Sequence, residues 1–165
     1  MEAYLDIETT GLACFGDAIT VIGIFRCDEK YEEFAQLWGD QVTAENLLRE
    51  LEEVETIYTY NGSRFDLPFI EAALRVKLDR KFKHHDLMYD CWGQGLKGGF
   101  KAVECRLGIE RETRGVTGYD AVLLWYRFKR NGDHNALRTL LQYNKDDVVN
   151  LRALRHELAR RGSRC

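Results

Sequence analysis

The sequence has very little proline and no segment of low complexity. Pro68 is the single proline among 165 residues, and no stretch is dominated by a few residue types. Disordered chains and interdomain linkers are typically rich in such features. The length suits one domain with a sizeable core. We therefore expect residues 1–165 to form a single domain.

Features of membrane and secreted proteins are also missing. No run of about 18 apolar residues occurs, and no basic segment precedes an apolar one at the N-terminus. The five cysteines are odd in number and include no C-x-x-C pair. This usage favours free thiols in a reducing compartment over disulfides or a cysteine metal site. We expect a cytoplasmic protein without a membrane partner.

The charge balance leaves the kind of partner open. The 24 basic and 27 acidic side chains give a net charge of −3, which by itself argues against nucleic acid. However, the basic residues cluster at 75–85, 97–101 and 127–130, and two bound divalent ions would bring the total from −3 to +1. Such clusters are typical of solvated faces as well as of polyanion-binding surfaces, so they permit a nucleic-acid partner without establishing one.

Strand patterns dominate the first third of the chain and helical patterns the rest. Short connections between the first three expected strands predict an antiparallel meander, and the strand–helix–strand order at 56–86 predicts a parallel, right-handed crossover. The sequence therefore predicts a mixed α/β sheet of five strands flanked by helices. The expected strands are 3–8, 18–27, 31–37, 55–60 and 82–86, and the expected helices include 44–54 after Thr43, one from about Leu67, and 135–160.

The first strand carries two acidic residues on one face. Side chains alternate along a strand, so Asp6 and Glu8 point the same way as Tyr4, while Leu5 and Ile7 point the other way. Two like charges on a half-buried face repel each other and lose hydration. No Lys or Arg lies within this stretch. A hard divalent cation such as Mg²⁺ or Mn²⁺ would compensate the pair, so it predicts a metal site.

A second polar segment follows the fourth strand. Asn61 and Asp66 lie at its carboxyl end, the edge where open α/β sheets usually bind ligands. Each also has a purely structural interpretation. Asp66 could cap the helix that begins near Leu67, and Asn61 could be an ordinary turn residue before Gly62.

The last helix places an acid where its pattern requires an apolar residue. Leu140, Asp147, Leu151, Leu154 and Leu158 form one stripe, with Tyr143 on the same face. Asp147 and Tyr143 could share a site, or they could be an internally hydrogen-bonded Asp and a core tyrosine. The neighbouring Asp146 is expected to point elsewhere, into solvent.

Together the three segments resemble the exonuclease motifs of the DEDD superfamily. They are Asp6-Ile7-Glu8-Thr9-Thr10-Gly11, Asn61-Gly62-Ser63-Arg64-Phe65-Asp66 and Tyr143-Asn144-Lys145-Asp146-Asp147. The tyrosine of the third motif is typical of the DEDDy subgroup. With Asp86-Leu87 and the stretch 99–109, the whole pattern is similar to the YprB-like exonucleases, which have a ribonuclease H-like fold.

This resemblance implies a metal-dependent 3′–5′ exonuclease that releases nucleoside monophosphates from the single-stranded 3′ end of DNA or RNA. Asp6, Glu8, Asp66 and Asp147 match the acidic ligands of two divalent ions, Mg²⁺ or Mn²⁺. Tyr143 matches the residue that orients or deprotonates the attacking water, and because a free tyrosine is a poor base at neutral pH we expect it to orient the water. Further matching positions, expected to contact substrate, are Thr9, Leu12, Asn61, Phe65 and Asp86.

Several alternatives remain open from the sequence. Asp86 could cap the next helix instead of touching substrate. His85 and Asp90 have the His–Asp spacing of the DEDDh subgroup, but they are not on the final helix, and we interpret the spacing as coincidental. The chain could also be a non-catalytic nucleic-acid-binding module or a structure-specific endonuclease. A separate protein partner could provide its targeting.

Overall fold

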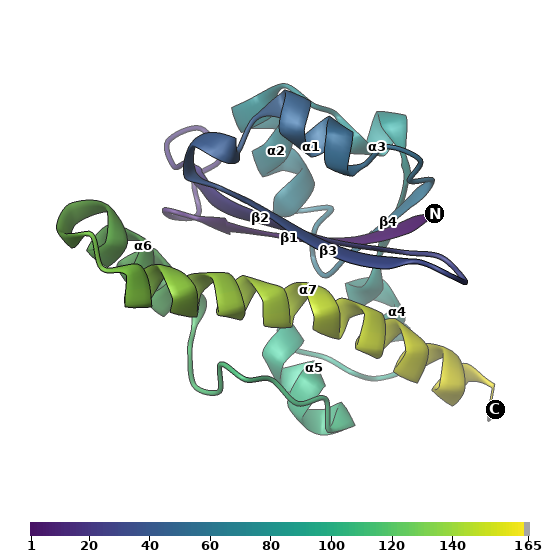
Figure 1. Ribbon diagram of the computed structural model, residues 1–165. Helices are drawn as coiled ribbons and strands as arrows, with labels where there is room; N and C mark the ends of the chain where they lie inside the picture. The colour runs from purple at the N-terminus through teal and green to yellow at the C-terminus, as the bar shows by residue number, and fades with distance from the viewer. Residues whose placement is uncertain (164–165) are drawn as a thin grey trace.

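A five-stranded mixed sheet forms the centre of the molecule (Figure 1). The structure is a computed structural model that describes residues 1–163. The strand order is β3-β2-β1-β4-β5, with β1–β2 and β2–β3 antiparallel and β1–β4 and β4–β5 parallel. This arrangement confirms the predicted ribonuclease H-like sheet. The strands are β1 (Glu2–Thr9), β2 (Ile19–Cys27), β3 (Glu32–Trp38), β4 (Thr56–Thr59) and β5 (Lys83–Asp86).

Helices cover both faces of the sheet (Figure 1). One face carries α1 (Ala44–Glu50), α2 (Asp66–Leu74) and α3 (Leu78–Lys81), and a short 3₁₀ helix at Gly39–Gln41 precedes α1. The long α7 (His134–Gly162) runs along the other face. On that side also lie α4 (Leu87–Gly93), α5 (Phe100–Leu107) and α6 (Gly118–Asn131).

Alternation along β1 sends its side chains into two different cores. Leu5 and Ile7 belong to the apolar cluster under α1–α3. Tyr4 belongs to the cluster that includes residues of α4, α5 and α7. Because Asp6 and Glu8 share the face of Tyr4, they point towards α7. The predicted facing of the first strand is confirmed.

Helix α7 packs closely on β1 and β2. Its predicted stripe is buried, including Leu140, Leu151, Leu154 and Leu158. Gly23 on β2 lies opposite Asp6 in the sheet, and a Cβ at Gly23 would overlap the side chains of Asn144 and Val148. The absence of a side chain at position 23 therefore allows α7 to approach the strand that carries the acids.

The observed helix starts show whether Asp66 and Asp86 cap helices, a question that the sequence left open. Thr43 caps α1, accepting a hydrogen bond from the Asn46 amide at 3.1 Å, as predicted. Asp66 is not a cap, since α2 begins at Asp66 itself after Phe65. Asp86 does cap α4, accepting from the Met88 amide at 3.2 Å.

Two further features concern the helices and the cysteines of the described residues. Within residues 1–163, none of the helices combines the length and hydropathy needed to cross a membrane. Cys14, Cys27, Cys91 and Cys105 are free thiols, whereas Cys165 lies outside the described residues.

Candidate metal centre

Three of the predicted acids converge between β1 and α7. Asp6, Glu8 and Asp147 each offer a carboxylate oxygen, and these three oxygens lie within 4.8 Å of one another. Glu8 and Asp147 are buried, and Asp6 is partly exposed. Asp6 and Glu8 come from one face of β1, and Asp147 comes from the buried stripe of α7. The three side chains could hold a metal ion.

The acids differ in whether their carboxylate oxygens accept hydrogen bonds. The Asn144 side-chain amide donates to the Asp6 carboxylate at 3.2 Å and to the Asp6 backbone carbonyl at 3.3 Å. Gln36 fixes the orientation of Asn144 by donating to its Oδ1 at 2.9 Å. Glu8 Oε1, in contrast, is buried and has no hydrogen-bond donor within the described residues. An unpaired carboxylate oxygen among other carboxylates is what a bound cation would stabilise.

The electrostatics confirm that this cluster is costly to ionise. Burial, followed by the negative charge of Asp147, raises the pKa of Asp6 and of Glu8 well above their ordinary values. The pKa of Asp147 is also raised by burial, but the nearby Arg111 guanidinium opposes this shift. Without a cation, the cluster therefore holds its protons to higher pH than isolated carboxylates do.

Asp66 lies beside the three acids and is tied to β1. Its Oδ1 accepts a hydrogen bond from the backbone amide of Ile7, the residue between Asp6 and Glu8, at 3.1 Å. Burial raises the pKa of Asp66 to about 7, although the Ile7 hydrogen bond opposes the shift. Its negative charge also raises the pKa of Asp6 and Glu8. Asp66 is thus electrostatically part of the site but outside the group of three oxygens within 4.8 Å.

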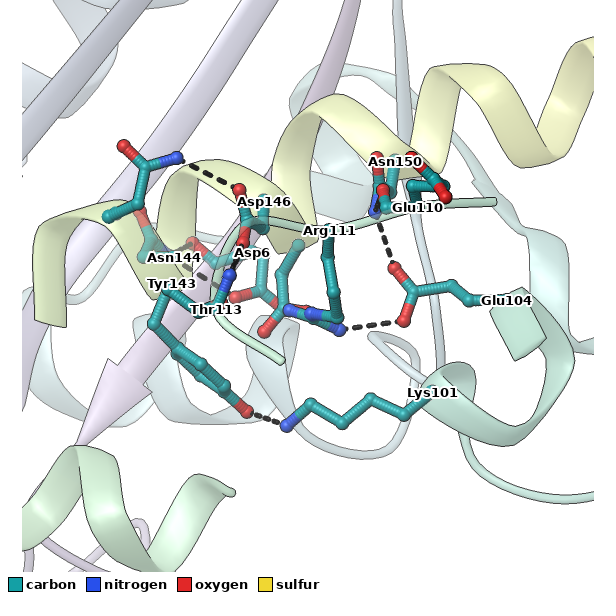
Figure 2. Close-up of polar contacts among 12 residues, drawn as sticks. Asp6, Lys101, Glu104, Glu110, Arg111, Thr113, Tyr143, Asn144, Asp146 and Asn150 are labelled. Carbon is teal, nitrogen blue, oxygen red and sulfur yellow. Dashed lines mark hydrogen bonds and ion pairs between the residues drawn. The ribbon is translucent and has the colours of Figure 1, made fainter. Parts of the chain in front are cut away.

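Tyr143 is held next to the acids by a lysine. Its hydroxyl accepts a hydrogen bond from Lys101 (Figure 2), and the Lys101 Nζ lies 4.1 Å from the tyrosine ring centroid. Burial, followed by the charges of Asp147 and Glu8, raises the pKa of Tyr143 far above its ordinary value. Burial lowers the pKa of Lys101. Tyr143 therefore carries its proton at neutral pH.

Arg111 is the second cation of the site. Its Nη2 donates to Asp147 Oδ1 at 2.5 Å and its Nη1 to Glu104 Oε2 at 2.6 Å. Asn150 donates to the other oxygen of Glu104 at 2.7 Å, and Figure 2 shows the contacts of Glu104 with Arg111 and Asn150 beside α7. The first strand contains no compensating cation, but α5 and the loop after it bring two from more than ninety residues away.

Asp146 corrects one expectation. It is buried and accepts hydrogen bonds from the Thr113 amide at 2.8 Å and the Thr113 hydroxyl at 2.6 Å. Gln142 donates to its other oxygen at 2.9 Å. The prediction that Asp146 points into solvent is wrong, because the loop after α5 folds back over α7 and covers it.

The predicted substrate-contacting positions Thr9, Leu12, Asn61 and Phe65 lie at the end of β1 and in the segments that follow β1 and β4. The Thr9 hydroxyl donates to the Gly11 carbonyl at 2.5 Å, and Leu12 is 87% exposed. Asn61 has a left-handed backbone with φ of 63°, a conformation that asparagine tolerates. The Phe65 ring packs on Phe69, 5.4 Å between centroids, against the core under α1–α3.

Asp86 has a structural role in the loop that carries Asp66. Besides capping α4, it accepts from the Asn61 amide at 2.7 Å, from the Ser63 amide at 3.1 Å and from the Ser63 hydroxyl at 2.6 Å. His85 and Asp90 do contact each other, at 2.5 Å, but both side chains are exposed and lie outside the acid cluster.

Lys101, Glu104, Arg111 and Asn144 are site residues that the sequence did not identify. Asn144 left a signal, because its spacing from Leu140, Asp147 and Leu151 puts it on the buried stripe of α7. Lys101 lies in the stretch 99–109 of the family resemblance, which gave it no role of its own. Arg111 left no signal, since a single basic residue in a loop usually faces solvent.

Comparison with known proteins identifies the family. A family model described as the RNase_H superfamily matches residues 3–159. The chain belongs to the RNase H superfamily. This superfamily member is 28% identical to the uncharacterized protein YprB of Bacillus subtilis over 92% of the chain, which spans 40% of YprB. It is 30% identical to the uncharacterized protein MJ0365 of Methanocaldococcus jannaschii, covering 89% of each chain.

Solved structures share the fold. The family B DNA polymerase of Pyrobaculum calidifontis aligns with a TM-score of 0.70 at 16% identity, over 96% of this chain and 24% of the polymerase. The apo form of a nuclease aligns with a TM-score of 0.60 at 20% identity, over 99% of this chain and 73% of that one. Exonuclease I in complex with SSB and the inhibitor CFAM aligns with a TM-score of 0.51 at 15% identity, over 79% of this chain and 42% of that one. These likenesses establish the fold alone.

Proposed function

We propose that this chain is a single-domain, metal-dependent 3′–5′ exonuclease of the DEDDy type, acting on DNA or RNA. The observation that carries the proposal is the convergence of Asp6, Glu8 and Asp147 around an unpaired carboxylate oxygen of Glu8. A module that only bound a polyanion would be weakened by such a cluster. The polarity and the subgroup follow from the resemblance of the three sequence motifs.

The donor set suits Mg²⁺ or Mn²⁺, because every proposed ligand is a carboxylate. Asp6, Glu8 and Asp147 would hold one ion, and Asp66 with Asp6 would hold a second. Two such ions, when bound, activate the attacking water and stabilise the leaving oxygen of a phosphodiester. The protein's own contribution is to fix the four carboxylates, with Asn144 setting the position of Asp6 and the Ile7 amide setting that of Asp66.

Tyr143 would orient the attacking water. Its raised pKa keeps the hydroxyl protonated, so it acts as a hydrogen-bond donor and not as a general base. The Lys101 ammonium occupies an acceptor position of the hydroxyl, which leaves the O–H free to point away from Lys101. A cavity of about 240 Å³ lies here, lined by residues that include Asp6, Tyr60, Lys101 and Asp147.

The substrate would be a single-stranded 3′ end. The exposed Leu12 would wedge against the terminal base, and Asn61 and Phe65 would lie near its sugar and base. Thr9 and Asp86 would contribute indirectly, by hydrogen bonds that fix the loop at Gly11 and the loop at Asn61. A protein partner would supply targeting.

The decisive experiment uses 3′-end-labelled and 5′-end-labelled single strands of DNA and RNA, with Mg²⁺, Mn²⁺ or EDTA. We expect mononucleotides to be released progressively from the 3′ end, and we expect EDTA and Asp6→Asn to abolish this. Glu52→Gln, which alters an exposed acid just after α1, is the matched control and should keep full activity.

Each of the other outcomes contradicts the proposal. Binding without cleavage under every metal condition would indicate a non-catalytic nucleic-acid-binding module. Internal cuts in both labelled strands would indicate an endonuclease on the same fold.

A further inference from the structure

Arg111 makes a buried bridge between an acid of the metal centre and one outside it. Its side chain is 9% exposed, that of Glu104 1% and that of Asp147 11%. Nη1 of the guanidinium contacts Glu104 (Figure 2), and Nη2 contacts Asp147. Neither the family resemblance nor the sequence patterns assign a role to this residue.

The two arms have different surroundings. Glu104 is fixed from behind by Asn150, which also donates to the Glu110 carbonyl at 3.0 Å. The loop that carries Arg111 is fastened to α7 two residues later, where Thr113 donates to Asp146. The Nη1 group is thus bound to a carboxylate, Glu104, whose position is fixed by Asn150. The Nη2 arm, in contrast, contacts Asp147, a proposed metal ligand.

A divalent ion and Arg111 therefore compete for the same carboxylate. When an ion takes Asp147 Oδ1, the oxygen that Nη2 contacts, the Nη2 group loses its acceptor. The buried Nε of Arg111 already has no partner within the described residues. A buried guanidinium with unpaired donors is costly. A phosphodiester offers two anionic oxygens that match the planar fork of arginine.

The guanidinium is also close to where the substrate would react. Its central carbon lies 5.4 Å from the ring centroid of Tyr143, the proposed water-orienting residue. A phosphodiester at the metal centre would therefore be the nearest new acceptor for the freed arm.

We propose that Arg111 is the counter-ion of Asp147 in the metal-free protein and transfers its free donors to the substrate phosphodiester when metal binds. Arg111 thereby makes the binding of metal and of a nucleotide phosphate cooperative. Glu104 and Asn150 act as positioning residues that hold the other arm. The inference rests on the proposed function, since it requires that Asp147 is a metal ligand.

The test is calorimetric titration of Mn²⁺ into the full chain, with and without thymidine 5′-monophosphate. The main variant is Arg111→Gln with Glu104→Gln, because this pair removes one positive and one negative charge. The net charge is unchanged, and Lys101 remains as the cation near Asp147. In the wild type, we expect the nucleotide to tighten Mn²⁺ binding about 10-fold, within the usual range for coupled sites. In the double variant we expect Mn²⁺ alone to bind about 10-fold more tightly, and the nucleotide to change that affinity less than about 2-fold.

Arg111→Lys is the second variant. Its charge is retained, but one ammonium cannot reproduce the two-armed bridge, so we expect reduced coupling in a folded protein. The inference is overturned if the double variant binds Mn²⁺ no more tightly than the wild type, or if its coupling to the nucleotide is unchanged. A wild type that binds no Mn²⁺, or binds it as Asp6→Asn does, overturns the proposed function itself.

Discussion

At the scale of single residues, the buried carboxyl groups work against folding when no cation is present. Asp66 is 3% exposed, and burial raises its pKa from 3.8 to about 7. For an acid whose pKa is higher in the folded state, the protonated form is the one compatible with folding. Its contribution to stability is complete below pH 4 and is lost as the pH rises towards 7 and above.

The change Asp66→Asn removes this penalty, because an amide does not ionise yet can still accept from the Ile7 amide. In EDTA at pH 8 we expect the variant to have a free energy of unfolding about 2 kcal/mol higher than the wild type. At pH 4 the two proteins should differ by less than about 1 kcal/mol. Urea unfolding at both pH values measures the difference, and a variant less stable at pH 8 would contradict the assignment.

Tyr143→Phe tests the role of one hydroxyl. The ring, which belongs to the same apolar cluster as Leu140 and Trp125, remains, so stability should change by about 1 kcal/mol or less. Loss of the donor that orients water should lower kcat about 100-fold with little change in KM. Tyr119→Phe, at a side chain 72% exposed, is the control and should behave as wild type. Equal kcat in Tyr143→Phe and wild type would remove Tyr143 from the reaction.

At the scale of elements, one helix and one strand decide the geometry. Helix α7 delivers Tyr143, Asn144 and Asp147 from a single face, and it can do so because Gly23 leaves β2 without a side chain at the crossing. Asn144 then reaches through to Asp6. The separation of α7 from the sheet thus sets the distances among the acids.

Gly23→Ala should push α7 away from β2. The added Cβ meets the Asn144 and Val148 side chains in a packed core, so we expect a loss of about 2–3 kcal/mol in stability. Mn²⁺ affinity should fall as well, because the contact between Asn144 and Asp6 loosens. Gly118→Ala is the matched control, since a Cβ there has no atom within 4 Å. Thermal melting and Mn²⁺ titration of both variants decide whether close approach at Gly23 matters.

At the scale of the whole molecule, the candidate metal centre depends on complete folding. Its acids come from β1, the start of α2 and the middle of α7, and its two cations come from α5 and the following loop. No short segment holds even three of these groups. Metal binding should therefore stabilise the folded state as a unit.

Mn²⁺ at 100 times its dissociation constant should raise the free energy of unfolding by about 2.7 kcal/mol at pH 8. The gain should shrink at pH 5, because Asp6, Glu8 and Asp66, whose pKa values are raised, then carry protons that the ion must displace. Melting temperatures with Mn²⁺ or EDTA at both pH values check this. The same shift in Asp6→Asn as in the wild type would indicate binding elsewhere.

The sequence by itself determined the antiparallel meander and the parallel crossover of the sheet, the facing of Asp6 and Glu8, and the buried position of Asp147. Strand alternation and helical periodicity are local rules, so a pair two residues apart and an acid on a leucine stripe can be recognised without coordinates. The predicted strand and helix boundaries were shifted by a few residues, because ends depend on caps and neighbouring chains.

Only the tertiary structure decided which cations meet these acids. Arg111 and Lys101 are distant from them in sequence, and nothing in their local context marks a basic side chain that is turned inward. Asp146 was expected in solvent because the loop around Thr113, which covers it, is also distant in sequence. Coulomb interactions depend on distance in space and on burial, not on sequence separation. The first strand alone therefore indicated a missing positive charge, and the fold shows that Arg111 and Lys101 supply part of it.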